Sequence, residues 1–364
     1  RDPEMSRGLG DVYKRQDGNG VEQDQEKAFQ YFQKASEAGD ESAMFNLADC
    51  YFNGLGTEQS EEQAVPWYQK AAEANISIAQ YMLGTCYHFG KGVSPNEELA
   101  LHWLRKAAEQ DYVGAQYALG TLLFRNEDSG ENDAEAVRWL ERAAELGDIG
   151  SQVKLGVCYQ DGYNVLEQGK VCFKEDMEKA VELFQNAAEQ GDAEGQFQLA
   201  NSYRFGLGVK KNVPKMLYWL RLSAMQGYAE AQYALGICYQ DGIGVKADME
   251  KAMDWYERSA AQNYPDAICS VGMYYLDEED DVETAKRLVY KAAQMDCPEA
   301  QYLMGMFLYE GDDSEEDEEA VAWFRMAARY QNHGGAMGML GYCYMNGTGV
   351  EQDDEMARVW LKRA

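Results

Sequence analysis

The chain has 364 residues, with 63 Asp or Glu against 33 Lys or Arg, so its formal net charge is −30 at pH 7. A charge of this sign repels nucleic acid and anionic lipid, and we expect neither as a partner. Hydrophobic residues make up 46% of the chain, as in folded proteins, and no run of about 18 apolar residues that would span a membrane is present.

The first residues differ from the rest of the chain. Residues 1–16 read RDPEMSRGLGDVYKRQ, which looks like translated adapter sequence rather than coding sequence. The repeat that fills the remaining chain enters its register near Asp17, because Gly18 and Gly20 match glycines that recur later. We therefore predict a non-native leader over 1–16, followed by a leading half-repeat of one helix over 17–40.

From residue 41 to the end, residue types recur with a period of about 36 residues. One marker is the residue that ends the phrase LGxCY, found at Tyr51, Tyr87, Leu123, Tyr159, Tyr203, Tyr239, Tyr275, Leu308 and Tyr344. A second marker is a small residue such as Ala64, and all seven tryptophans lie three residues after it. Two markers with one period predict about nine repeats over 41–364, the last one truncated.

Each repeat is predicted to form two helices. In the first, Ala43, Leu47 and Cys50 have the i, i+4, i+7 spacing of an apolar helical face. A Gly-x-Gly pair such as Gly54 and Gly56 then ends this helix, because glycine adopts positive φ at low cost.

The second helix is predicted to begin after an N-cap residue, whose side chain accepts a hydrogen bond from a free backbone N–H. The predicted N-cap positions are Asp24, Ser60, Asn96, Asn132, Asp176, Asn212, Asp248, Asp281, Glu316 and Asp353. The predicted ends of the second helices are near Gly39, Asn75, Asp111, Gly147, Gly191 and Gly227.

Four stretches depart from this pattern. Residues 163–175 hold a loop enlarged by an insertion, and residues 276–283 are shortened and lack the glycines. Residues 125–133 and 310–319 also lose the Gly-x-Gly turn. We expect these loops to turn differently while the helices on either side keep their phase.

The consensus AxxxLGxxYxxGxGVxxDxxKAxxWYxxAAxxG resembles the Sel1-like repeat, a relative of the tetratricopeptide repeat, from about residue 17 to the end. The resemblance implies an all-α fold, a right-handed α-solenoid superhelix of stacked antiparallel helix pairs. It also implies that the first helices line the concave side of the superhelix and the second helices its convex side.

A second stripe on the first helices is the candidate partner-binding surface. It lies two, six and nine residues after the small residue, and its last two members vary between repeats while the apolar core stripe is nearly uniform. A surface fitted to one partner would vary in this way, and so would neutral drift on a solvated face. The candidate residues are Phe45, Asp49, Phe52, Tyr81, Thr85, His88, Tyr117, Thr121, Phe124, Phe197, Asn201, Arg204, Tyr233 and Gln240.

Five of the eight cysteines precede the marker residue directly, at Cys50, Cys86, Cys158, Cys238 and Cys343. Some secreted relatives join each helix pair by a disulfide, which needs two cysteines in a repeat. Equivalent atoms of adjacent repeats are separated by two helices, well beyond the Cα spacing of roughly 6 Å that a disulfide tolerates. We predict buried free thiols and a reducing, cytoplasmic compartment. Cys172 in the insertion and Cys297 in a turn are the candidates for exposure, with no evident partner.

No motif points to catalysis, a metal or a cofactor. His88, His102 and His333 are isolated, and the chain has no CxxC or HxxxH spacing. The phrases GKGV and GLGV lack the Gly-Lys-Ser/Thr that binds phosphate in a P-loop. No carboxylate pair stands apart from the acidic background, so we expect a protein that is not an enzyme and needs no cofactor.

A glutamine also recurs directly after the small residue of the first helix. It is present at Gln80, Gln116, Gln152, Gln196, Gln232 and Gln301. Two interpretations are open, a hydrogen-bonded row along the array and packing at helix ends or between repeats, and we favour the second.

These patterns favour a non-enzymatic scaffold or adaptor that binds a protein or peptide in the concave groove. The acidic charge predicts a partner with basic character, because long-range attraction would steer it toward the protein. Two alternatives stay open. One is a regulatory or substrate-recruiting part of an enzyme complex, such as a secretory-pathway ubiquitin-ligase adaptor, and the other is a β-lactam-binding relative of the cysteine-rich type, whose paired cysteines this chain lacks.

Overall fold

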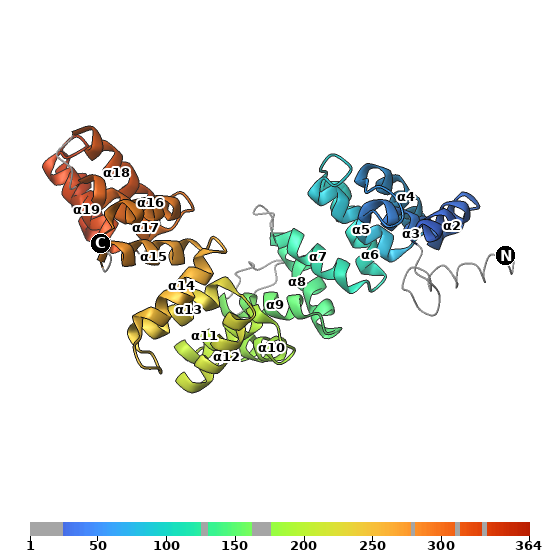
Figure 1. Ribbon diagram of the computed structural model, residues 1–364, viewed down its shortest axis with the longest axis horizontal. Coiled ribbons are helices and arrows are strands. Elements are labelled where there is room, and N and C mark those ends of the chain that lie inside the picture. Colours follow the sequence, from blue (N-terminus) through green and yellow to red (C-terminus); the bar gives the residue numbers. More distant parts are fainter. Residues whose placement is uncertain (1–24, 125–129, 162–175, 278–280, 310–313, 330–332) are drawn as a thin grey trace. The chain divides into compact units, whose positions relative to one another are not determined.

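The computed structural model describes residues 25–124, 130–161, 176–277, 281–309, 314–329 and 333–364, and these residues form 19 α-helices and no strand (Figure 1). In chain order the helices are α2 (Gln25–Glu37), α3 (Glu41–Asn53), α4 (Glu61–Glu73), α5 (Ser77–Phe89), α6 (Glu97–Glu109), α7 (Val113–Phe124), α8 (Gly130–Glu145), α9 (Ile149–Asp161), α10 (Met177–Glu189), α11 (Ala193–Phe205), α12 (Val213–Met225), α13 (Ala229–Asp241), α14 (Met249–Ala260), α15 (Pro265–Asp277), α16 (Val282–Ala293), α17 (Pro298–Tyr309), α18 (Ser314–Ala328), α19 (Gly334–Asn346) and α20 (Asp354–Arg363). The predicted leader, the insertion at 163–175 and Cys172 lie outside the described residues.

The chain divides into two compact units, residues 1–186 and 187–364, with the boundary inside α10. Within each unit, consecutive helices pack against each other (Figure 1). The larger contacts join the two helices of a pair, such as α5 with α6 and α13 with α14, and smaller contacts join one pair to the next. The structure therefore confirms the predicted all-α architecture of stacked helix pairs.

A Gly-x-Gly turn ends the first helix of each regular pair. Gly54 has a left-handed φ of 71° and its N–H donates to the carbonyl of Cys50 at the end of α3. The second glycine has a further role, because a Cβ at Gly56 would overlap the backbone of Gln25 at the start of α2. The turn thus ends one helix and packs closely on the preceding pair.

The predicted caps explain where most second helices begin. Asn96 accepts a hydrogen bond from the backbone N–H of Leu99 at 3.0 Å and starts α6. The same capping is present at Ser60, Asp176, Asn212, Asp248, Asp281 and Asp353. The second helices also end where predicted, with positive φ at Gly39, Asn75, Asp111, Gly147, Gly191 and Gly227.

Two predicted helix starts were wrong. α8 begins at Gly130 and α18 at Ser314, so Asn132 and Glu316 lie inside these helices and not at their N-caps. Both helices follow a loop without the Gly-x-Gly turn, and acidic residues are favourable in the first turn of a helix. The chain therefore enters each helix earlier than the repeat register predicts.

Small residues in the first helices allow the two helices of a pair to approach closely. A Cβ on Gly236 of α13 would lie 2.5 Å from the ring of Tyr256, which is 2% exposed on α14. Gly84 and Gly120 face Leu104 and Leu140 in the same way. Large buried side chains such as Tyr68, Tyr256 and Phe324 thus follow tryptophans by one position, while the tryptophans themselves are half-buried.

The structure confirms the predicted burial of the five cysteines that follow the repeat register, but not the predicted exposure of Cys297. Cys50, Cys86, Cys158, Cys238 and Cys343 are buried free thiols. Cys297, for which we expected exposure in a turn, is 2% exposed. This expectation was wrong because the turn before α17 packs against Cys269 of α15, a contact between residues far apart in the sequence.

Candidate functional site

The candidate residues from the sequence lie on α3, α5 and α7 of the first unit and on α11 and α13 of the second. Tyr117 and Gln240 are exposed, and the other members are half-buried. Partial exposure is what a binding surface requires, but the contacts differ between the three positions of the stripe.

The first position carries aromatic rings that join successive repeats. The ring of Tyr81 on α5 lies 5.2 Å from that of Tyr112, which directly precedes α7. Phe197 and Tyr233 make equivalent contacts with Tyr228 and Tyr264, at 5.4 Å in both cases. These rings therefore have a packing role that the sequence comparison did not assign to them.

Other members interact mainly within their own repeat. Phe45 and Phe52 both pack against Tyr68 of α4, with ring centroids 5.9 and 6.0 Å away. Asp49 accepts a hydrogen bond from Asn53 at 2.8 Å, and burial raises the pKa of Asp49.

The threonines and the remaining residues of the stripe have contacts mainly within their own helices. The hydroxyls of Thr85 and Thr121 donate to carbonyls of their own helices, at 2.7 and 2.9 Å. The ring of His88 makes an edge-to-face contact with that of Phe89, and the guanidinium of Arg204 lies 5.2 Å from the ring of Phe205. Phe124 and Asn201 are half-buried on α7 and α11.

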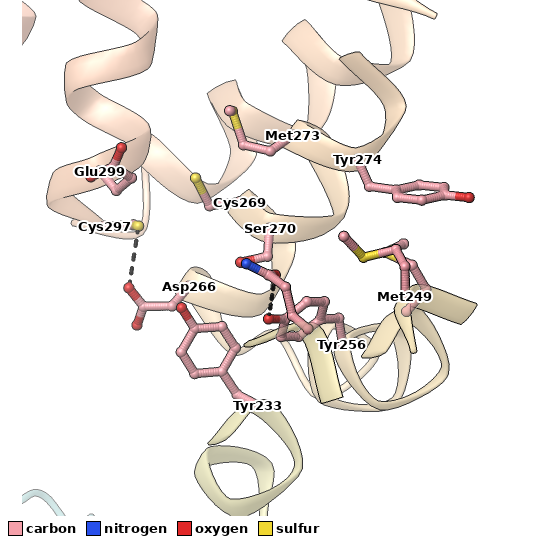
Figure 2. Close-up of a pocket in the computed structure, with 12 residues that line it drawn as sticks. Tyr233, Met249, Tyr256, Asp266, Cys269, Ser270, Met273, Tyr274, Cys297 and Glu299 are labelled. Carbon is pink, nitrogen blue, oxygen red and sulfur yellow. Dashed lines mark hydrogen bonds between the residues drawn. The ribbon is translucent and has the colours of Figure 1, made fainter. Parts of the chain in front are cut away.

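A pocket of about 290 Å³ lies in the second unit, among α13, α14, α15 and the start of α17 (Figure 2). Tyr233 and Gln240 line it, so the structure brings two of the predicted residues together in one cavity. The hydroxyl of Tyr256 donates to Oε1 of Gln240 at 2.8 Å. Burial raises the pKa of Tyr256, so this phenol stays protonated and remains a donor at neutral pH.

The walls of the pocket combine apolar and aromatic surface with polar groups. Met249 and Met253 come from α14 and Met273 from α15. Ser270 of α15 and Tyr233 of α13 also line the pocket. The sulfur atoms and the rings give a polarizable surface of the kind that adapts to bound groups of different shape.

Two carboxylates give the pocket a negative charge. Asp266 lies in the first turn of α15 and Glu299 in the first turn of α17. Asp266 accepts a weak hydrogen bond from the Cys297 thiol at 3.5 Å, and Glu299 lies 3.1 Å from Nε2 of His333. Among the twelve described residues that line the pocket, none is Lys or Arg. The arrangement can therefore hold a cation with an apolar stem.

The sequence comparison missed most of this pocket. The stripe was followed only as far as Gln240, although Cys269 and Met273 occupy its first two positions in the next repeat. Carrying the same spacing one repeat further would have found both residues. Asp266 and Glu299 were hidden among the many carboxylates of the chain, and no local pattern distinguishes them.

The Sel1 repeat profile matches residues 6–40, 41–76, 77–112, 113–148, 149–192, 193–228, 229–264, 298–329 and 335–364. The chain belongs to the Sel1-repeat family. The stretch 265–297, which holds α15 and α16, falls between two matches, yet it forms a helix pair like the others. The first match begins inside the predicted leader, and the boundary at residue 16 stays a prediction.

Two solved Sel1-type structures are similar over long stretches. A protective antigen of uropathogenic Escherichia coli that displays an SLR fold is 29% identical, with a TM-score of 0.68, over 99% of this chain and 78% of that chain. A Sel1 repeat protein from Oxalobacter formigenes is 32% identical, with a TM-score of 0.61, over 71% of this chain and 97% of that one. A comparison with curated proteins gives no significant match.

Two further findings bear on the site. Within the part of the chain that the structure describes, no helix has the length and apolar character needed to cross a membrane. The described residues also contain no group of three or more His, Cys, Asp or Glu placed to hold a metal ion.

Proposed function

We propose that this Sel1-repeat protein is a scaffold that binds a basic segment of a partner protein, and that the pocket of the second unit receives a Lys or Arg side chain. Proteins of the family generally serve as protein-interaction scaffolds, and the repeat fold is typically non-catalytic. The observation that carries the proposal is the joint presence of Asp266 and Glu299 in a pocket walled by methionine and tyrosine.

The chemistry of the pocket suits a long cationic side chain. Its methylene groups would pack on Met249, Met253 and the ring of Tyr256. Its charged end would reach Asp266 and Glu299 and lie against aromatic faces, which attract cations. Arg has the stronger case, because its planar guanidinium stacks on rings and pairs with carboxylates in a bidentate manner.

Long-range attraction would add to these contacts. The formal net charge of −30 draws a basic segment toward the protein before any contact forms. Close contact then selects the pocket, because hydrogen bonds to charged groups contribute about 1.5–3 kcal/mol each. The two steps are separable, since a change in the pocket leaves the overall charge almost unaltered.

Selection from a random peptide display library tests the proposal on the full chain. We expect peptides selected on the unmodified protein to carry Lys or Arg at one fixed position. The variant Asp266→Asn with Glu299→Gln is expected to lose this preference. The variant Glu97→Gln with Glu98→Gln removes the same number of charges from an exposed turn of α6 and is expected to keep it.

Selected peptides without enriched Lys or Arg would contradict the proposal. Identical selections on the pocket variant and the unmodified protein would also contradict it. Circular dichroism melting of both variants checks that each is folded. A reducing, cytoplasmic compartment is in keeping with the buried free thiols and stays a prediction.

A further inference from the structure

Successive first helices meet at a recurring joint, made by the first stripe residue and the residue just before the next first helix. Within the described residues, aromatic rings fill this joint at Tyr81–Tyr112, Phe197–Tyr228, Tyr233–Tyr264 and Tyr302–His333. At the joint between α15 and α17 the equivalent positions hold Cys269 and Cys297. Two thiols replace two rings there, and the pocket described above opens beside them.

The two thiols share one buried cluster. Cys269 and Cys297 belong to the same group of packed side chains, and they are 3% and 2% exposed. Figure 2 shows them next to each other on one side of the pocket, near Asp266 and Glu299. The other described cysteines that follow the repeat register, such as Cys86, pack among apolar side chains of the helix-pair core.

The two sulfur atoms differ in their electrostatic surroundings, and therefore in the pKa of their thiols. Cys297 directly precedes α17, where the helix dipole favours negative charge. The neighbouring Cys269 thiol and the backbone at Ala300 lower the pKa of Cys297, although burial and the carboxylate of Asp266 act in the opposite direction. The neighbouring Cys297 and burial raise the pKa of Cys269.

We propose that Cys269 and Cys297 are a redox-active pair that hydrogen peroxide oxidises to an intramolecular disulfide. The Cys297 thiolate attacks one peroxide oxygen, the O–O bond breaks, and hydroxide leaves and takes a proton to become water. The Cys297 sulfur is now a sulfenic acid. Cys269 then gives up its proton and attacks that sulfur, the S–O bond breaks, and a second water leaves. In sum, two thiols are oxidised and one peroxide is reduced to two waters.

The pocket supplies the access that buried thiols otherwise lack. Both cysteines line it, and peroxide is small enough to enter a space of about 290 Å³. The new bond would tie α15 to the start of α17 and fix one wall of the pocket. Oxidation does not require a basic partner, so this inference stands or fails independently of the proposed function.

Peptide mapping of the full chain tests the pair directly. Tryptic cleavage after Arg258 and Lys286 releases Cys269, and cleavage after Lys291 and Arg325 releases Cys297, each as the single cysteine of its peptide. The reduced native protein is treated with peroxide, alkylated in denaturant, digested and analysed without reduction. We expect the cross-linked peptide pair to be the dominant disulfide. Cys86, whose pKa burial raises to about 11, should remain a free thiol that is fully alkylated.

Two variants separate the roles of the sulfur atoms. In Cys269→Ser, the sulfenic acid at Cys297 has no resolving thiol, and we expect dimedone to label it. In Cys297→Ser, we expect dimedone labelling of Cys269 to be at least about tenfold lower, because its thiolate is disfavoured. The proposal is overturned if native Cys269 and Cys297 are alkylated as fully as Cys86 after peroxide treatment. It is also overturned if pairing in the native protein is no more selective than pairing in denaturant.

Discussion

The Nε2 group of Gln110, which directly follows α6, donates a hydrogen bond to Oε1 of Gln80 on α5 at 2.7 Å, which joins the two helices of one repeat. Gln80 in turn donates to the carbonyl of Ala72 at 3.0 Å, in the last turn of α4. The same pairing links Gln226 to Gln196 and Gln262 to Gln232. The recurring glutamines therefore lie at helix ends and link each repeat to the preceding one, as in the interpretation that we favoured, and they do so through hydrogen bonds, as in the other.

This pairing predicts unequal effects of two similar substitutions. Gln80→Leu removes the bond to Ala72 and the nearest acceptor of the Gln110 amide, which keeps only longer bonds to Asn75 and Lys106, so we expect a loss of about 2 kcal/mol in the free energy of unfolding. Gln116→Leu removes the bond to the carbonyl of Ala108, but the buried Oε1 of Gln116 has no partner in the structure, so the loss should be about 1 kcal/mol. Urea unfolding followed by circular dichroism measures both, and equal losses would refute the explanation.

Close packing of α13 on α14 predicts that Gly236, the glycine of LGICY, tolerates no side chain. Gly236→Ala would place a methyl group 2.5 Å from the Tyr256 ring, and we expect destabilisation by about 1–3 kcal/mol. Gly338→Ala is the matched control, because a Cβ there would have no neighbour closer than 4.0 Å. Ala is the better helix former, so the control should be neutral or gain up to about 1 kcal/mol. Equal changes in melting temperature for the two variants would contradict this explanation.

A pair of charged residues predicts an acid-sensitive contribution to stability. Nε and Nη2 of Arg105 donate to the two carboxylate oxygens of Glu135, both at 2.9 Å, and Trp139 donates to the same carboxylate. These bonds hold the pKa of Glu135 below its ordinary value. Because the folded pKa is lowered, the stabilisation is present above the unfolded pKa of about 4.3 and is lost as pH falls through the folded value.

The substitution Glu135→Gln measures this contribution. We expect it to lower the free energy of unfolding by about 1 kcal/mol at neutral pH, since both side chains are partly exposed and solvent weakens the pair. As pH falls through the folded pKa of Glu135, the difference in stability between the variant and the unmodified protein should shrink toward zero. A difference that does not change with pH would show that the lost contact is one of packing rather than charge.

Local sequence rules predicted the regular parts of the fold. Asn96 begins a helix and Gly54 ends one because each acts on backbone groups a few residues away. The start of α8 at Gly130 was missed because its loop lacks the glycines that set the register elsewhere. The burial of Cys297 was missed for a different reason, since it depends on Cys269 in another helix.

The candidate site was predicted only in part, because it too depends on contacts between residues far apart in the sequence. Tyr233 and Gln240 share one helix, and helical spacing places both on the face that lines the pocket. Asp266 and Glu299 begin two later first helices and reach the pocket through the stacking of repeats. Periodicity identifies the face of a helix, but it does not show which faces of different repeats enclose a cavity.

The acidic charge predicts a strong salt dependence of partner association. The association rate of a Lys- or Arg-containing peptide should fall by at least about tenfold between low and high ionic strength, because dissolved ions screen long-range attraction. The dissociation rate should change much less. Stopped-flow fluorescence resolves the two rates, and an association rate that is independent of salt would argue against electrostatic steering.

The most direct test of the proposed function is a double-mutant cycle between the pocket and a selected peptide, measured by isothermal titration calorimetry. The change in the peptide replaces the enriched Arg by citrulline, or the enriched Lys by norleucine. The change in the protein is Asp266→Asn with Glu299→Gln. If the cationic side chain enters the pocket, the two changes will be coupled by more than about 1 kcal/mol. Losses in affinity that simply add would place the basic side chain elsewhere and contradict the account.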